Sequence, residues 1–143
     1  MAGVDIDLIV RDICRLRPGL EGVSETVDVY SVLEHSRIFY FHAGGEGRYY
    51  TGSADWMTRN LDSRVEAIAP IDDPRLQTRL EAILETLLTD GANRWVMRSD
   101  GTYEPCRSPE GEAGLDVHEA FMWGSKDGVT ALEDWSESLP GER

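Results

Sequence analysis

Residues 37–52 read Arg-Ile-Phe-Tyr-Phe-His-Ala-Gly-Gly-Glu-Gly-Arg-Tyr-Tyr-Thr-Gly. Aromatic residues, which favour strands, stand on both sides of Gly44 and Gly45. Adjacent glycines adopt the positive φ values of tight turns without steric cost. The stretch therefore predicts an antiparallel hairpin, with strands over 37–42 and 48–52 and a loop over 43–47.

Alternating and continuous apolar patterns predict further strands on both sides of this hairpin. They cover residues 4–10, 27–32, 64–69 and 93–98, and the last of them turns back through Tyr103. We therefore predict an α/β fold with a mixed β-sheet that carries the hairpin and is flanked by helices.

The clearest predicted helix spans residues 74–90. Asp73 can cap its first turn, Pro74 suits the first helical position, and Gly91 follows its end. Its apolar side chains recur at helical spacing and are expected in the core; they are Leu76, Leu80, Ile83, Leu84, Leu87 and Leu88.

The C-terminal part differs in composition. From Ser108 onward the chain is rich in Pro, Gly, Glu and Ser, which predicts an acidic, loosely ordered tail over 108–143 after a domain over 1–107. Within the tail, an apolar group predicts one short helix that docks on the domain; it is Val117, Phe121, Met122 and Trp123.

The 143-residue chain carries a net charge of −13, and Lys126 is its one lysine among 14 basic residues. Excess acid with arginine in place of lysine favours adaptation to high salt, and general compositional bias is the alternative. The sequence contains neither a long apolar run nor a signal-peptide pattern, so we expect a cytoplasmic protein with no membrane span. Cys14 and Cys106 are expected to be free thiols.

Two short motifs flank the hairpin. Leu33-Glu34-His35-Ser36-Arg37 leads into its first strand, and Gly52-Ser53-Ala54-Asp55-Trp56 follows its second, so strand pairing is expected to bring His35 close to Gly52 and Ser53. Histidine can attack phosphorus or donate a proton to a leaving oxygen. A guanidinium such as that of Arg37 can neutralise phosphate oxygens, and Asp55 can orient a ring nitrogen.

Structural roles compete with this interpretation. A histidine beside a strand is more often structural or solvated than catalytic, and Gly-Ser at a turn is usually only a turn. Trp56 is expected in the core, and Arg37 and Arg48 can serve as paired surface charges. His42 and His118 lack acidic or cysteine partners at metal-ligand spacing, so no metal site is assigned.

The two motifs resemble half of a phospholipase D-type active site, in which two such halves face one pocket. More closely, residues 4–11, 22–25, 33–38 and 52–62 resemble the C-terminal catalytic domain of long-form polyphosphate kinases. The resemblance spans residues 3–105 and includes several separate motifs in the same order.

This resemblance implies reversible transfer of the terminal phosphate of ATP to polyphosphate, with Mg²⁺ and a phosphohistidine intermediate. The phosphorylated histidine belongs to the other half-site, upstream of this sequence. His35 matches the second active-site histidine, an acid/base or transition-state partner. Arg11 matches an arginine that contacts nucleotide phosphates, and the residues placed around the phosphate pocket are Arg37, Ser53, Asp55 and Asn60. ATP or ADP, polyphosphate and a chain that supplies the missing kinase domains are the implied partners; nucleic acid is not.

Three departures from the family pattern bear on activity. Asp12 stands where the family usually has glycine, the segment between Ser31 and Leu33 is shorter, and Ser63-Arg64 replaces a pair of arginines. Three hypotheses therefore remain open. The chain is a kinase fragment that is inactive alone, a non-catalytic module that binds nucleotide, polyphosphate or a kinase, or a gene remnant.

Overall fold

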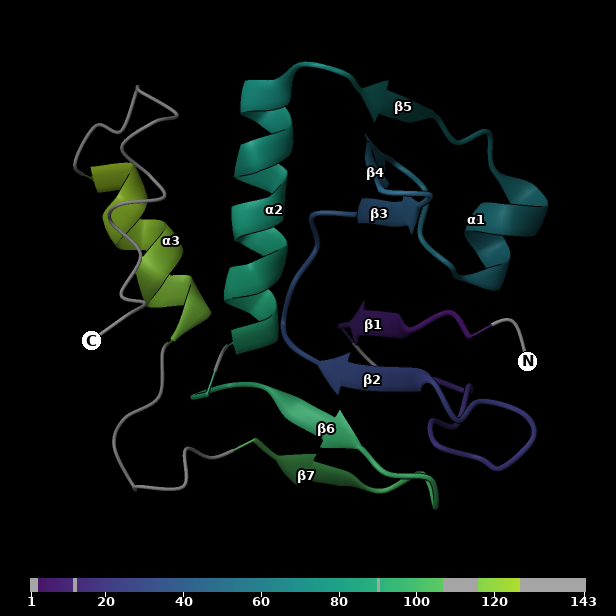
Figure 1. The fold of residues 1–143 in the computed structure, drawn as a ribbon. Coiled ribbons are helices and arrows are strands. Elements are labelled where there is room, and N and C mark those ends of the chain that lie inside the picture. Colours follow the sequence, from purple (N-terminus) through teal and green to yellow (C-terminus); the bar gives the residue numbers. More distant parts are fainter. Residues whose placement is uncertain (1–2, 12, 90, 107–115, 127–143) are drawn as a thin grey trace. The chain divides into compact units, whose positions relative to one another are not determined.

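The computed structural model describes residues 3–11, 13–89, 91–106 and 116–126 (Figure 1). The described chain divides into two compact units. Unit 1 contains the described residues up to Glu34 and from Glu85 onward, and unit 2 contains His35–Leu84.

Unit 1 contains a four-stranded sheet in the order β1-β2-β6-β7. Its strands are β1 (Ile6–Val10), β2 (Val27–Ser31), β6 (Trp95–Met97) and β7 (Tyr103–Pro105). β1 is parallel to β2, whereas β2 with β6 and β6 with β7 are antiparallel. This is the predicted mixed sheet, and its buried core consists of Val27, Val29 and Met97, with Leu8, Val10, Cys14 and Tyr103 packed against them.

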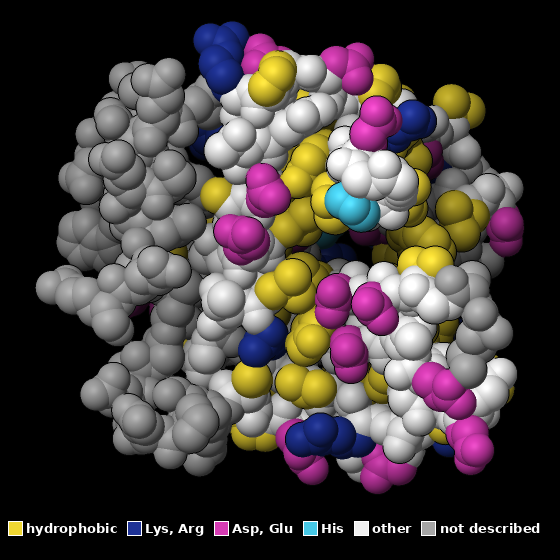
Figure 2. Space-filling view, viewed as in Figure 1, with side chains coloured by type: hydrophobic (Ala, Val, Ile, Leu, Met, Phe, Trp, Pro, Cys, Tyr) yellow, Lys and Arg dark blue, Asp and Glu magenta, His cyan; other side chains and the backbone are white. Residues whose placement is uncertain are grey.

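Acidic side chains gather over β1 and β2 (Figure 2). The strand register places Asp7 beside Asp28. Burial raises the pKa of the neighbouring Tyr30 hydroxyl, and the negative charges of Asp28 and Asp7 raise it further, while Arg94 opposes them. The guanidinium of Arg94 lies 4.9 Å from the centre of the Tyr30 ring, so this arginine partly offsets the acidic face.

Unit 2 contains the hairpin within a three-stranded antiparallel sheet, β3-β4-β5. The strands are β3 (Ile38–Ala43), β4 (Glu46–Gly52) and β5 (Ile68–Ile71), and α1 (Thr58–Ser63) lies between β4 and β5 in sequence. Gly44 and Gly45 form the turn, with φ values of 63° and 87°. Positive φ at both central residues matches the twist of paired strands, which confirms the predicted hairpin.

Helix α2 (Pro74–Thr89) confirms the predicted helix almost to the residue. The backbone N–H of Arg75 donates to Asp73 Oδ1 at 2.9 Å, as a capping residue requires. Hydrogen bonds from Arg75, the side-chain bond first, lower the pKa of Asp73. Leu87 is fully buried, as predicted, but Leu76 is exposed.

The short helix predicted in the C-terminal part is confirmed as α3 (Val117–Lys126) in unit 1. Backbone N–H groups of His118 and Glu119 donate to Asp116 Oδ1, which caps it. The other residues of the expected tail, 108–115 and 127–143, lie outside the described residues. Among the residues that the structure does describe, no helix has the length and apolarity needed to cross a membrane.

The α/β class is confirmed, but the hairpin does not belong to the mixed sheet. β2 already pairs with β1 on one side and with β6 on the other, so no edge of β2 is open to β3. The strand expected over 64–69 lies instead at β5, because pairing with β4 begins at Ile68 opposite Gly52. Helix α1 was not anticipated from the sequence.

Gly52 permits a close approach between β4 and β5. A Cβ atom at this position would overlap the carbonyl oxygen of Ala67 and lie 2.9 Å from the Cα of Ile68. Both neighbours are backbone atoms, so relief requires a shift of the strand rather than of a flexible side chain.

We expect Gly52→Ala to lower the free energy of unfolding by about 2–3 kcal/mol, as overpacking against fixed atoms does. Gly44→Ala is the control, because a Cβ there meets open space and only the left-handed backbone resists it. That backbone penalty is about 1 kcal/mol. Urea unfolding of both variants tests the order, and an equal loss at both sites would contradict the close approach.

Candidate functional site

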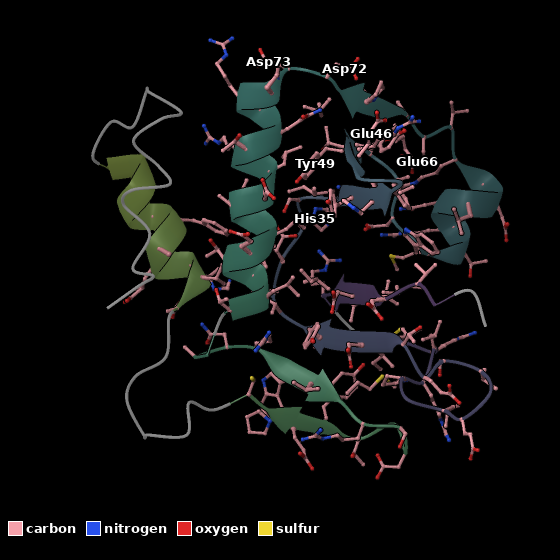
Figure 3. The ribbon with its side chains drawn as sticks, in the orientation of Figure 1. His35, Glu46, Tyr49, Glu66, Asp72 and Asp73 are labelled. Atoms are coloured by element: carbon pink, nitrogen blue, oxygen red, sulfur yellow. The ribbon has the colours of Figure 1, made fainter. Side chains whose placement is uncertain are left out.

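The side chains of His35, Arg37 and Asp55 meet in unit 2, and Arg37 contacts both of the others. Its Nη2 atom donates to Asp55 Oδ2 at 2.9 Å. Nη1 lies 3.2 Å from His35 Nδ1 and Nη2 lies 3.1 Å from His35 Nε2. The structure therefore brings together three of the residues predicted for the site; Figure 3 shows His35 among the side chains of unit 2.

The guanidinium faces both ring nitrogens of His35. A guanidinium only donates, and a neutral imidazole accepts at one nitrogen, so one of the two contacts is a hydrogen bond in either tautomer. Asp55 Oδ2 lies 3.8 Å from His35 Nε2, beyond hydrogen-bond distance. Arg37, rather than Asp55, therefore makes the direct contact with the ring.

Arg37 has an unusual backbone conformation. Its φ of 51° is the one positive value at a non-glycine residue in the part of the chain that the structure describes. Such a conformation costs about 1–2 kcal/mol and clusters at functional sites. Arg37 Nε is buried and has no hydrogen-bond partner among the described residues. Strain and an unused donor thus coincide at one residue.

The cluster is open to solutes. The side chain of His35 is 49% exposed, and those of Arg37 and Asp55 are 23% and 27% exposed. A small anion could therefore reach the guanidinium and the imidazole together.

Ser53 is exposed but already hydrogen-bonded, and Asn60 is buried. The Ser53 hydroxyl donates to Glu66 Oε2 at 2.5 Å and accepts from the Ala67 N–H at 3.1 Å, so it links β4 to the approach to β5. Asn60 is 3% exposed, and its Oδ1 lacks a partner among the described residues. The expectation that Trp56 is a core residue was wrong, since it is 79% exposed.

Arg11 belongs to unit 1, whereas the cluster of His35, Arg37 and Asp55 belongs to unit 2. Arg11 lines an open pocket of about 490 Å³ with polar, aliphatic and aromatic residues of the same unit, which are Ser31, Val32, Leu33, Asn93, Trp95, Asp116 and His118. His118 Nε2 donates to the Leu33 carbonyl oxygen at 2.9 Å. A hydrogen bond from Asn93 is the main reason why the pKa of Asp116 is lowered. Asp12 lies outside the described residues.

The described residues contain no preassembled cluster of metal ligands. They include no group of three or more His, Cys, Asp or Glu side chains placed to hold a metal ion. The carboxylate of the cluster, Asp55, is bound to a guanidinium instead.

A family model described as "Polyphosphate kinase C-terminal domain 2" matches residues 1–116. The chain is 52% identical over 125 residues to the polyphosphate kinase of Thermosynechococcus vestitus, covering 85% of this chain and 17% of that protein. It is 58% identical over 115 residues to the polyphosphate kinase of Synechocystis, and this match covers 76% of this chain and 16% of that protein. The crystal structure of polyphosphate kinase from Porphyromonas gingivalis matches with a TM-score of 0.77 and 35% identity, over 88% of this chain and 20% of that one.

These similarities define an α/β chain that corresponds to the C-terminal part of the polyphosphate kinases it matches. The chain belongs to the polyphosphate kinase family. It spans about one sixth of the length of the curated relatives named above.

The sequence did not identify two residues that shape the site. Glu66 holds the Ser53 hydroxyl, yet it lies in a stretch predicted as strand, with nothing to distinguish it from a surface glutamate. His118 was set aside because it had no metal-spaced partner, but it binds a backbone carbonyl that is far from it in sequence. Long-range contacts of this kind leave no local pattern.

We expect His35→Ala to change the free energy of unfolding by no more than about 1 kcal/mol, because its side chain is half exposed. Val29→Ala, at a fully buried position of unit 1, is the comparison and should cost at least about 1–2 kcal/mol. Urea unfolding measures both. A loss at His35 as large as that at Val29 would indicate a structural histidine.

Proposed function

We propose that this chain provides one half of a polyphosphate kinase active site, which completes a working enzyme only with the other half. The observation that carries the proposal is the cluster of His35, Arg37 and Asp55 at the hairpin of a chain that belongs to this family. The proposed reaction is reversible transfer of the terminal phosphate of ATP to polyphosphate.

In this proposal His35 acts in proton transfer or in stabilisation of the transferred group. When neutral, the ring accepts a proton from an attacking oxygen at the nitrogen that otherwise accepts from Arg37; when protonated, it donates to a leaving oxygen. Its contacts with Arg37 hold the ring at the mouth of β3. The ring is half exposed, which suits contact with an incoming phosphate.

Arg37 supplies positive charge to the phosphoryl oxygens, and Arg11 contacts the nucleotide phosphates from the open pocket in unit 1. Ser53, held by Glu66 and Ala67, fixes the loop that carries Asp55. Asn60 supports the same loop from a buried position. When Mg²⁺ is bound in a complete enzyme, it neutralises phosphate charge; the residues described here contain no preassembled cluster of ligands for it.

Half a pocket cannot hold a donor and an acceptor in line, which phosphoryl transfer requires. The histidine that carries the phosphoryl group is proposed to come from another polypeptide segment. The chain spans 17% of the Thermosynechococcus kinase, which is consistent with this division. Because of the net charge of −13, the proposal includes a preference for high salt, where self-repulsion is screened.

Complementation tests this proposal. The Thermosynechococcus relative is produced without the segment that this chain matches, and the two proteins are mixed with ATP and Mg²⁺ at several salt concentrations. We expect polyphosphate to form only in the mixture, and the His35→Ala variant to lower its rate by at least about 100-fold, as loss of a proton-transfer residue does.

The control for that mixture is Glu46→Gln, at an exposed position of the hairpin turn, which should leave the rate unchanged. Polyphosphate made by the chain alone would contradict the need for a second half. No synthesis in the mixture, together with calorimetric binding of ATP or polyphosphate to the chain, would favour the non-catalytic binding module.

A further inference from the structure

We propose that Asp55 is an internal anion that occupies Arg37 until a phosphate oxygen displaces it. This inference rests on the proposed function of the cluster and adds a device to it. Asp55 would then compete with the phosphate for Arg37 instead of binding the phosphate. Release of Asp55 from Arg37 would open the site.

The first support is the geometry of the ion pair. Asp55 contacts the guanidinium through a single oxygen, Oδ2, and a single nitrogen, Nη2. Arginine binds carboxylate and phosphate most strongly through two parallel hydrogen bonds. A one-point pair is therefore weaker than the pair that a phosphate group, with several oxygens, can form with the same side chain.

The second support is the unused donor. Arg37 Nε is buried and has no partner among the described residues. Leaving a buried donor unsatisfied is costly, so an anion that reached both Nε and a terminal nitrogen would recover that cost. In this structure Asp55 contacts only Nη2 and leaves Nε unpaired, so replacing Asp55 with an anion that binds both nitrogens is energetically favoured.

The third support is the place that the displacing anion would take. Asp55 Oδ2 lies 3.8 Å from His35 Nε2, and both atoms share contact with Arg37 Nη2. A phosphate oxygen in the position of Oδ2 would therefore lie near this ring nitrogen, although still beyond hydrogen-bond distance. Displacement of Asp55 thus brings the substrate oxygen next to Arg37 and near His35, and the oxygen then moves closer to the ring to exchange a proton.

The exposure of the pair makes the exchange feasible. Arg37 and Asp55 keep 23% and 27% of their side-chain surfaces in solvent. Ion pairs with solvent access are weak, so a multivalent phosphate can displace the carboxylate.

The test measures binding of inorganic triphosphate to the chain by calorimetry at fixed ionic strength. Asp55→Asn keeps the size of the side chain and removes its charge. We expect it to bind triphosphate about two- to fivefold more tightly than the unaltered chain, which corresponds to the strength of a solvent-accessible pair. Arg37→Met should bind at least tenfold more weakly than the unaltered chain.

Glu46→Gln is the matched control. It removes one negative charge from the same unit, at a side chain that is 78% exposed and 3.9 Å from Arg48. Both substitutions change the net charge equally, so any general effect of charge is common to them. We expect Glu46→Gln to change the affinity by less than twofold.

Asp55→Ala is the second variant, used if Asp55→Asn does not give the circular dichroism spectrum of the folded chain. Equal or weaker binding by the Asp55 variants than by Glu46→Gln would overturn the inference, as would no binding of triphosphate by any protein. Failure here with successful complementation would leave the proposed function standing. If Asp55→Asn binds triphosphate more tightly but complementation fails, the proposed function is rejected. The inference that Asp55 competes with phosphate for Arg37 then still holds.

Discussion

The close approach of β4 to β5 at Gly52 is the constraint on which unit 2 depends. With only hydrogen at this Cα, the strand can lie against the backbone of Ala67 and Ile68. The next residue, Ser53, donates its backbone N–H to the Ala67 carbonyl at 2.9 Å, and its hydroxyl accepts from the Ala67 N–H. The chain is thus fixed on leaving β4. Asp55, two residues further on, is placed where Arg37 can reach it.

The opposite side of the cluster is fixed by the entry to β3. Arg37 adopts a left-handed backbone immediately before Ile38, the first residue of the strand. Pairing of β3 with β4 then brings Ile38 opposite Thr51, so the two ends of the hairpin carry the two motifs. The backbone strain at Arg37 is offset by the ladder that follows it, and the guanidinium is free to bridge His35 and Asp55.

Local patterns in the sequence were sufficient for most elements. The hairpin followed from Gly44 and Gly45, and α2 from its cap at Asp73 and its apolar spacing. Strand pairing alone predicted that the motif of His35 lies close to the turn at Gly52 and Ser53, and Asp55 of that second motif lies 3.8 Å from the His35 ring. Features set by contacts between distant residues could not be predicted. Nothing local shows that β2 is enclosed by β1 and β6, or that the hairpin pairs with β5 in a second sheet.

For the site residues too, contacts with residues distant in sequence could not be predicted. The residue types predicted phosphate chemistry, but not which oxygen or nitrogen of each side chain is already engaged. Ser53 looked available as an anion ligand and is bound to Glu66, whereas Trp56 looked like a core residue and is exposed. Hydrogen-bond satisfaction is decided after the chain folds, because the partners come from other strands.

Charge adds a further condition to any phosphate site in this chain. A net charge of −13 repels a polyanion at long range, so electrostatic steering cannot gather the substrate as it does in basic proteins. Salt screens such repulsion over about 8–10 Å, while contacts at hydrogen-bond distance are screened much less. Recognition must therefore rely on short-range donors such as the guanidinium of Arg37. A carboxylate that holds this guanidinium in place also shields it from other anions, so that an anion able to form two bonds displaces it more readily than one that forms a single bond.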